Sequence, residues 1–198
     1  MNIIEIFTKS LVLIFSLDKD LWEIILLSLY VSITALIFAS IFGLLIGYYL
    51  AIKNFFLKNF ILIILNSLMG IPPVVVGLIV YFMFASGGPL GVIQLLYTPT
   101  AMIIAQVIII FPIVTSLSHE IFDQNWREYK DQLRSINMTF FGILFIISKH
   151  SYFLVITVLL SAFGRAISEV GAVMIVGGNI DHYTRVMTTA ISLETRMG

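Results

Sequence analysis

The stretch IILLSLYVSITALIFASIFGLLIGYYLAI, residues 24–52, contains no charged side chain. A helix needs about 20 predominantly apolar residues to cross the hydrocarbon core of a bilayer, and this stretch is long enough to cross it with some tilt. The whole chain of 198 residues agrees, because 60% of it is hydrophobic and 11% is charged, whereas soluble domains contain about 25% charged residues. The stretch therefore predicts a membrane span in an integral membrane protein.

Three small residues, Ala39, Gly43 and Gly47, recur every four residues along this span. Small side chains at such spacing share a helix face and let two helices approach closely in a membrane. The pattern is compatible with packing inside one chain and with contact between two copies of the chain. Both interpretations stay open on the sequence alone.

Three further apolar stretches predict spans over about 60–84, 100–117 and 152–176. The first of them contains Pro72 and Pro73, which remove two backbone donors and clash with the preceding turn. We expect that span to kink or break there, with protein or a water-filled cavity covering the break. The fold class is therefore an all-α integral membrane protein, a polytopic helical bundle. No linker divides the chain, so residues 1–198 should form a single transmembrane domain.

The apolar run in the N-terminal stretch, residues 1–20, is too short to span a membrane. Glu5 precedes the first basic residue, Lys9, and no small-residue cleavage site follows the short apolar run. These features argue against a cleaved signal peptide. We expect a helix that lies in the membrane interface before the first span.

Basic residues in the short loops predict the topology. They occur between the first and second spans and again between the third and fourth, at Lys53, Lys58, Arg127, Lys130, Arg134 and Lys149, whereas the loop between the second and third spans has none. We therefore expect the polar segment 118–150 to be cytoplasmic. The N-terminus and the tail, residues 179–198, should lie on the outer side.

The fourth predicted span carries two charges, Arg165 and Glu169, at a spacing that places them on one helix face. A lone charge at the bilayer centre costs about 2.5–3.5 kcal/mol on insertion scales, so both should face the protein interior or a pore, close to Ser168. In one interpretation they line or gate the path of a charged solute. In the other they lock helices together, within a chain or across a dimer.

Several functions are disfavoured by what the sequence lacks. It has no cysteine, hence no disulfide or thiolate metal site, and no G-x-x-x-x-G-K-[ST] phosphate loop. His119, His150 and His182 are scattered without metal-ligand spacing, and a net charge of zero gives no sign of a nucleic-acid surface. We expect neither an enzyme nor a bound cofactor or metal, so any pumping must draw energy from a partner or an ion gradient.

The polar segment 118–150 resembles the cytoplasmic loop of importer permeases of the ATP-binding-cassette class, which reads E-A-A, three residues, G, nine residues, I-x-L-P. The corresponding residues here are Asp131, Gln132, Leu133, Asn137 and Ile147. Asp131 keeps the acid, Ile147 keeps the apolar position, and the others depart from the pattern. Asn137 in place of glycine still suits a tight turn. The resemblance implies a short helix pair that docks on an ATPase subunit.

The segment GRAISEVGAVMIVGGN, residues 164–179, is more specific. It resembles the R-A-x-x-E-x-G-A and G-N elements of molybdate, tungstate and sulfate importer permeases, and the T-x-x-x-x-x-A-I element follows at Thr184–Ile191. The proline pair in GIPPVVVGL, residues 70–78, also resembles a proline pair in the second span of these permeases. The sequences of these segments are most similar to those of the tungstate type. Permeases of this kind have a further span, which we would expect after Gly198.

The resemblance carries a functional expectation: a permease in a bacterial or archaeal cytoplasmic membrane that imports tungstate, with molybdate as the near alternative. Its expected partners are a second copy of the chain, two ATPase subunits that carry ATP and Mg²⁺, and an extracytoplasmic oxyanion-binding protein. The loop 86–99 and the tail would form the docking face for that binding protein.

Within the chain, the resemblance assigns Arg165 to lowering the barrier for a dianion, and Glu169 to preventing binding that is too tight. Pro72 and Pro73 become a candidate hinge, or simply a kink in a packed helix. A secondary anion transporter and a purely structural membrane subunit remain rival hypotheses, although no internal repeat of the kind found in secondary transporters is evident.

Overall fold

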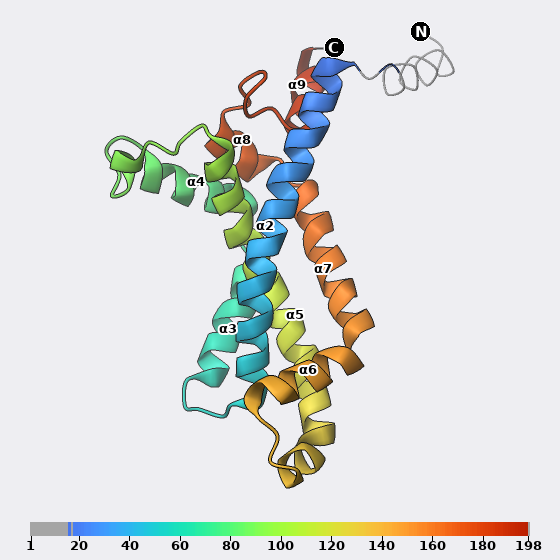
Figure 1. Cartoon of the computed structure of the whole chain (residues 1–198). Helices are drawn as coiled ribbons and strands as arrows, with labels where there is room; N and C mark the ends of the chain where they lie inside the picture. The colour runs from blue at the N-terminus through green and yellow to red at the C-terminus, as the bar shows by residue number, and fades with distance from the viewer. Residues whose placement is uncertain (1–15, 17, 198) are drawn as a thin grey trace.

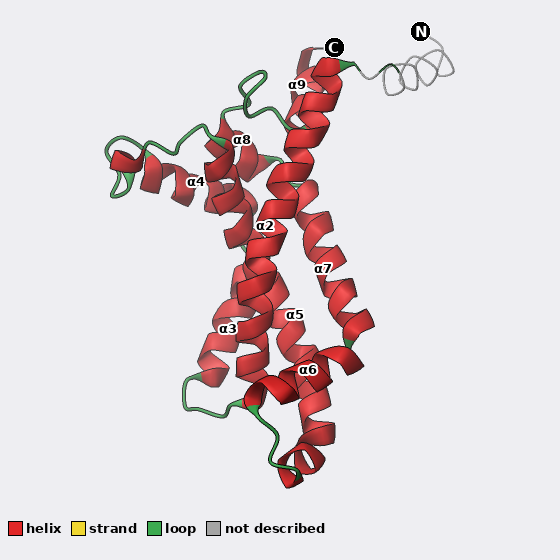
Figure 2. Cartoon of the chain, viewed as in Figure 1, coloured by secondary structure: helices red, strands yellow, loops and turns green. Residues whose placement is uncertain are grey.

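The computed structural model describes residue 16 and residues 18–197, and these are helices joined by loops, without a strand (Figure 2). Two long helices, α2 (Lys19–Ile52) and α5 (Pro99–Ser135), run side by side along the molecule (Figure 1). Each is long and apolar enough to cross a membrane. The first predicted span is therefore confirmed as a helix, and residue 117 is not a helix end, because α5 continues to Ser135. The predicted interfacial helix at 1–20 lies almost wholly outside the described residues.

Local sequence signals explain where the two long helices begin. The side chain of Asp18 accepts a hydrogen bond from Leu21 N at 3.0 Å and caps α2, and Thr98 Oγ1 accepts one from Ala101 N at 3.3 Å and caps α5. Such caps satisfy backbone donors that a helix start leaves free. Pro99 follows at the first helical position, where a missing N–H costs nothing.

The small residues of α2 are used within the chain. A Cβ on Gly43 would lie 2.9 Å from Val114 Cγ1, and one on Gly47 would lie 2.8 Å from the backbone oxygen of Thr115. Ala39 is fully buried. Both glycines face α5, so this stripe provides the close contact of α2 and α5 and is not a free surface for a second copy.

The second predicted span is broken, as the two prolines predict. It forms α3 (Lys58–Met69) and α4 (Pro73–Phe84), whose axes differ in direction by 101°. Pro72 has extended backbone and Pro73 opens α4. Figure 1 shows α4 turned away from the line of α3.

The fourth predicted span, 152–176, is not one continuous helix. The chain forms α7 (Tyr152–Ile167) and α8 (Gly171–Gly177), with Ser168–Val170 between them. Ser168 N and Glu169 N bond back to Gly164 O and Ala166 O, each at 3.2 Å, and the Glu169 side chain then accepts the backbone N–H of Ala172. A glutamate that caps a new helix replaces the expected uninterrupted one.

Two shorter helices complete the ends. The helix pair expected in 118–150 consists of the end of α5 and α6 (Phe140–His150), with Asn137 in the left-handed conformation at φ 50° in the turn between them. α6 meets α7 at a bend of 80°. At the opposite end of the molecule, α9 (Met187–Met197) lies beside the start of α2, and Met187 N donates to Ser28 Oγ at 2.7 Å. We call these the α6 end and the α9 end. A short 3₁₀ turn, Gly91–Ile93, lies in the loop between α4 and α5.

Candidate functional site: two helix breaks around an arginine

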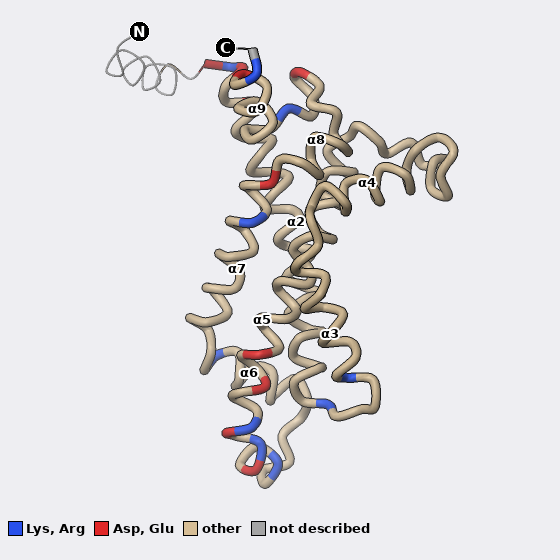
Figure 3. Tube along the Cα trace, turned by 180° about the vertical axis from the view of Figure 1, so that it is seen from behind, with Lys and Arg blue, Asp and Glu red and all other residues tan. Residues whose placement is uncertain are grey.

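Charged residues gather toward the α6 and α9 ends and are sparse between them (Figure 3). Arg165, in the last turn of α7, and Glu169, just beyond it, form an ion pair with Arg165 Nη1 2.9 Å from Glu169 Oε2. The Glu169 side chain is 5% exposed and that of Arg165 is 36% exposed. The two residues therefore pair, but they do not share a helix face as predicted, because Glu169 is not on the helix that carries Arg165.

Glu169 is tied into its surroundings from both sides. Its Oε1 accepts the backbone N–H of Ala172 at 3.1 Å, and its backbone oxygen accepts the Thr188 hydroxyl at 2.7 Å. The residue thus joins the end of α7, the start of α8 and the start of α9. Ser168, predicted to belong to the same site, donates instead to the backbone oxygen of Arg165 at 3.2 Å and lies at the surface.

Arg165 contributes to the wall of a cavity of about 300 Å³, to which we give the name outer cavity. The other lining residues come from α3, the proline turn, α4 and α5: Leu68, Met69, Ile71, Val76, Val107, Ile108, Ile109, Phe111, Pro112 and Ile113. Arg165 is the one charged side chain among these described lining residues. A positive charge against apolar walls is weakly screened, so its attraction for an anion is stronger there than in water.

The two helix breaks support each other next to this cavity. A Cβ on Gly77 of α4 would lie 2.7 Å from Ala172 Cα, and a Cβ on Gly171 would lie 2.6 Å from Val74 Cγ2. The segments that follow the two breaks, α4 and α8, are therefore in backbone contact. Pro72 and Pro73 do not line the cavity themselves, but Ile71 and Val76 on either side of them do, which places the candidate hinge at its edge.

A buried amide, Gln106 in α5, was not singled out by the sequence reasoning. It is 4% exposed, and its Nε2 donates to the backbone oxygen of Ala166 at 3.1 Å, in the last turn of α7. It also borders a very small polar cavity together with Ser28, Ser32, Glu169 and Thr188. The available signal was its position as the single amide in an otherwise apolar run, AMIIAQVIII.

The residues proposed to couple the chain to an ATPase divide into two groups. Leu133 and Ile147 are buried and pack in one cluster that joins α5 to α6. Asp131 and Gln132 are exposed on the end of α5, and Asn137 is exposed in the turn. The structure therefore gives the apolar positions a packing role and leaves the polar ones free at the α6 end. Among the described residues, no cluster of histidine, aspartate and glutamate is arranged to hold a metal ion.

The described residues thus form a helical bundle with helices long and apolar enough to cross a membrane, and its two helix breaks contact each other beside the cavity that Arg165 lines. Residues 39–197 match the family described as binding-protein-dependent transport system inner membrane component. The chain belongs to this family. It is accordingly a multi-pass membrane permease subunit of a transporter.

Individual relatives narrow the comparison. The chain is 40% identical to the tungstate uptake system permease protein TupB of Peptoclostridium acidaminophilum, over 99% of this chain and 86% of the relative. It is 36% identical to the protein of that name from Campylobacter jejuni, over 97% of this chain and 80% of the relative. A "Probable anion ABC transporter permease protein" from Haloferax volcanii is 38% identical, over 86% of this chain and 76% of the relative.

Proposed function

We propose that this chain is the transmembrane permease of an ATP-binding-cassette importer that carries tungstate into the cell, with molybdate as the near alternative. The observation that carries the proposal is Arg165 in the wall of an otherwise apolar cavity, in a chain whose relatives include two tungstate uptake permeases. A tetrahedral dianion crossing a low-dielectric region needs a fixed positive charge near its path. The relative described only as an anion permease favours a general oxyanion permease as the second candidate.

Glu169 sets the strength of this site. Because its carboxylate already pairs with Arg165 at 2.9 Å, an anion must compete for the guanidinium and cannot bind it at full strength. Passage requires binding that favours entry and still permits exit. The ion pair therefore suits a site that an anion passes through better than a site that holds an anion tightly.

The proposal also assigns partners and orientation. Two copies of the chain would form the permease, with the α6 end in the cytoplasm, two ATPase subunits carrying ATP and Mg²⁺ beneath it, and the N-terminus outside a bacterial or archaeal cytoplasmic membrane. The exposed Asp131, Gln132 and Asn137 would contact the ATPase, and Leu133 and Ile147 would keep α6 rigid against α5. The loop 86–99 and the tail 179–198 would receive an extracytoplasmic oxyanion-binding protein.

Motion would pass between the two sides through the broken helices. Closure of the ATPase dimer would tilt α6 and α5 as rigid bodies. The turn at Pro72 and Pro73, at the edge of the outer cavity, would absorb the change in direction between α3 and α4. A secondary transporter would need neither an ATPase nor the exposed polar group on α5, so Asp131→Ala, which should uncouple ATP hydrolysis, separates the two hypotheses.

The metal content of cells tests the substrate. Cells with and without the gene receive tungstate and molybdate together at low concentration, and both metals are measured by mass spectrometry. We expect the cells that lack the gene to lose tungsten and keep molybdenum. Loss of both metals would establish the general oxyanion permease, and no change in either would overturn the substrate assignment.

A further inference from the structure

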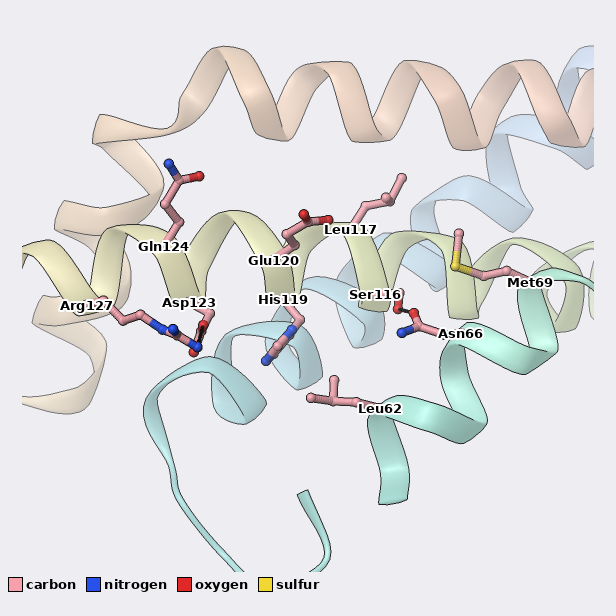
Figure 4. A pocket seen from close by; sticks show the side chains of 10 residues that line it. All are labelled: Leu62, Asn66, Met69, Ser116, Leu117, His119, Glu120, Asp123, Gln124 and Arg127. Atoms are coloured by element: carbon pink, nitrogen blue, oxygen red, sulfur yellow. Dashed lines mark hydrogen bonds and ion pairs between the residues drawn. The ribbon is translucent and has the colours of Figure 1, made fainter. Parts of the chain in front are cut away.

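A second cavity of about 590 Å³ lies between α3 and α5 on the side of the α6 end (Figure 4). Its lining is about half polar, whereas that of the outer cavity is mostly apolar. It consists of Leu62, Asn66, Met69, Ser116, Leu117, His119, Glu120, Asp123, Gln124 and Arg127. Met69 also lines the outer cavity. The two cavities therefore follow one another along the seam between α3 and α5, with the Met69 side chain at their common boundary. We call this second one the inner cavity.

The charged groups in and beside the inner cavity are two cations and two carboxylates, and both cations lie on one carboxylate, Asp123. Asp123 pairs with two cations: its Oδ2 lies 2.7 Å from Arg127 Nη2, and its Oδ1 lies 3.5 Å from Lys58 Nζ, at the start of α3. The Lys58 and Asp123 side chains are 14% and 17% exposed, so this pair is little screened, whereas Arg127 is 77% exposed and can move. Glu120 is exposed, as Arg127 is, so solvent and salt screen both of these charges. The cluster of Lys58, Asp123 and Arg127 by itself carries one net positive charge, and this cluster is the part of the cavity that would attract an anion.

Uncharged donors stand beside these cations. The Ser116 hydroxyl donates to Asn66 Oδ1, which turns the amide nitrogen of Asn66 away from Ser116 and toward His119 in Figure 4. His119 Nε2 is buried and has no hydrogen-bond partner among the described residues. A neutral imidazole can carry its proton on this nitrogen. A ligand with several acceptor oxygens would satisfy donors that the protein leaves free.

We propose that the inner cavity is a second binding station for the oxyanion, which the anion enters from the outer cavity past Met69 and leaves into the cytoplasm. This inference rests on the proposed function. Both cavities use one device: an arginine paired at four-residue spacing with a carboxylate, Arg165 with Glu169 and Arg127 with Asp123. In each cavity, the carboxylate competes with the anion for the guanidinium group. The inner station is the weaker because its arginine is more exposed, which favours release.

Equilibrium dialysis of the purified permease–ATPase complex against tungstate, without binding protein and without ATP, tests the proposal when bound tungsten is counted by mass spectrometry. We expect Arg127→Gln to lose one bound tungsten per permease chain. Asp123→Asn removes the competing carboxylate and should bind that tungsten several-fold more tightly. In vesicles, Asp123→Asn should lower the maximal uptake rate and leave the half-saturating external concentration unchanged. The control is Lys53→Gln, which removes a positive charge at the same end but outside the cavity.

Each outcome bears on the inference separately from the proposed function. If wild-type vesicles import tungstate while Arg127→Gln and Asp123→Asn bind as much tungsten as the wild type, the inner station is wrong and the importer stands. If wild-type vesicles import no tungstate, the proposed function itself fails. Lipid phosphate is the competing tetrahedral ligand: if phosphorus analysis shows that Arg127 retains phosphatidylglycerol and tungstate does not displace it, the cavity is a lipid site and the inference is overturned. Size-exclusion chromatography checks that each variant is folded.

Discussion

The two cavities along the seam between α3 and α5 differ in how polar their linings are. The outer one is apolar apart from Arg165, whereas the inner one has hydroxyl, amide, imidazole, carboxylate and guanidinium groups in its wall. The attraction between two charges is stronger in apolar surroundings than in polar ones. Arg165 should therefore affect the rate of anion passage more than Arg127 does. Substitutions in the two cavities should accordingly differ in their effect on uptake.

Arg165→Gln should lower ATP-driven tungstate uptake by tenfold or more, because the outer cavity then has no positive charge. Arg127→Gln should lower it far less, since Lys58 remains beside Asp123. Uptake of tungsten into vesicles containing the full transporter measures both. Equal losses in the two variants would contradict the ranking of the cavities.

Gly77→Ala should disrupt the wall of the outer cavity, because its Cβ would lie 2.7 Å from the backbone of Ala172. Overpacking of this kind costs about 1–3 kcal/mol, and we expect a lower unfolding temperature and slower uptake. Gly164→Ala is the matched control, since nothing lies within 4 Å of its added Cβ. The control should be neutral or slightly stabilising, and similar losses in both variants would refute the close contact of α4 with α8.

Gln106→Leu should have a smaller effect on stability. It removes the donor to Ala166 O, and hydrogen bonds between helices in membranes contribute about 0.6 kcal/mol on average. We expect a decrease of about 1–2 °C in the unfolding temperature of the complex, measured by calorimetry. A stability equal to that of the wild type would show that Gln106 does not hold the end of α7.

The smallest effect concerns His182, which lies outside both cavities. A hydrogen bond to Glu23, 3.0 Å away, raises the pKa of His182 above its usual 6.5, and Asp181 and the charge of Glu23 act in the same direction. A raised pKa means that the contact stabilises the α9 end fully below pH 6.5 and is lost as the pH rises through the folded-state value. The unfolding temperature should therefore fall slightly across that interval, and His182→Gln should abolish the change. An unchanged pH profile in His182→Gln would exclude this contact.

The sequence predicted one helix break and missed the other for a physical reason. A proline disrupts the helix at its own position, so Pro72 and Pro73 predict a break without knowledge of the surrounding structure. The break at Ser168–Val170 depends on the Glu169 carboxylate capturing Ala172 N and on the Thr188 hydroxyl reaching the Glu169 oxygen. An apolar run with a suitable charge spacing cannot indicate which hydrogen bonds its charges will make.

The candidate site shows the same division. The four-residue spacing of Arg165 and Glu169 favours a contact on one helix face, but Glu169 makes this contact from beyond the end of α7. The apolar outer cavity and the inner cavity combine residues of α3 and α5, such as Asn66 and Ser116, whose proximity is a tertiary property. Gln106 likewise acts on a residue 60 positions away. The local sequence pattern predicts neither the two cavities nor the hydrogen bond of Gln106.

The most direct test of the central claim is tungstate uptake by the double variant Arg165→Gln, Glu169→Gln in vesicles, with its stability measured in parallel. The amide oxygen of the substituted side chain in Glu169→Gln can still accept the N–H of Ala172, so the helix break should persist and the protein should fold, while no positive charge remains in the outer cavity. We predict a folded transporter with uptake reduced by tenfold or more. Uptake at the wild-type rate would contradict the account and would leave the ion pair a device that only locks helices together.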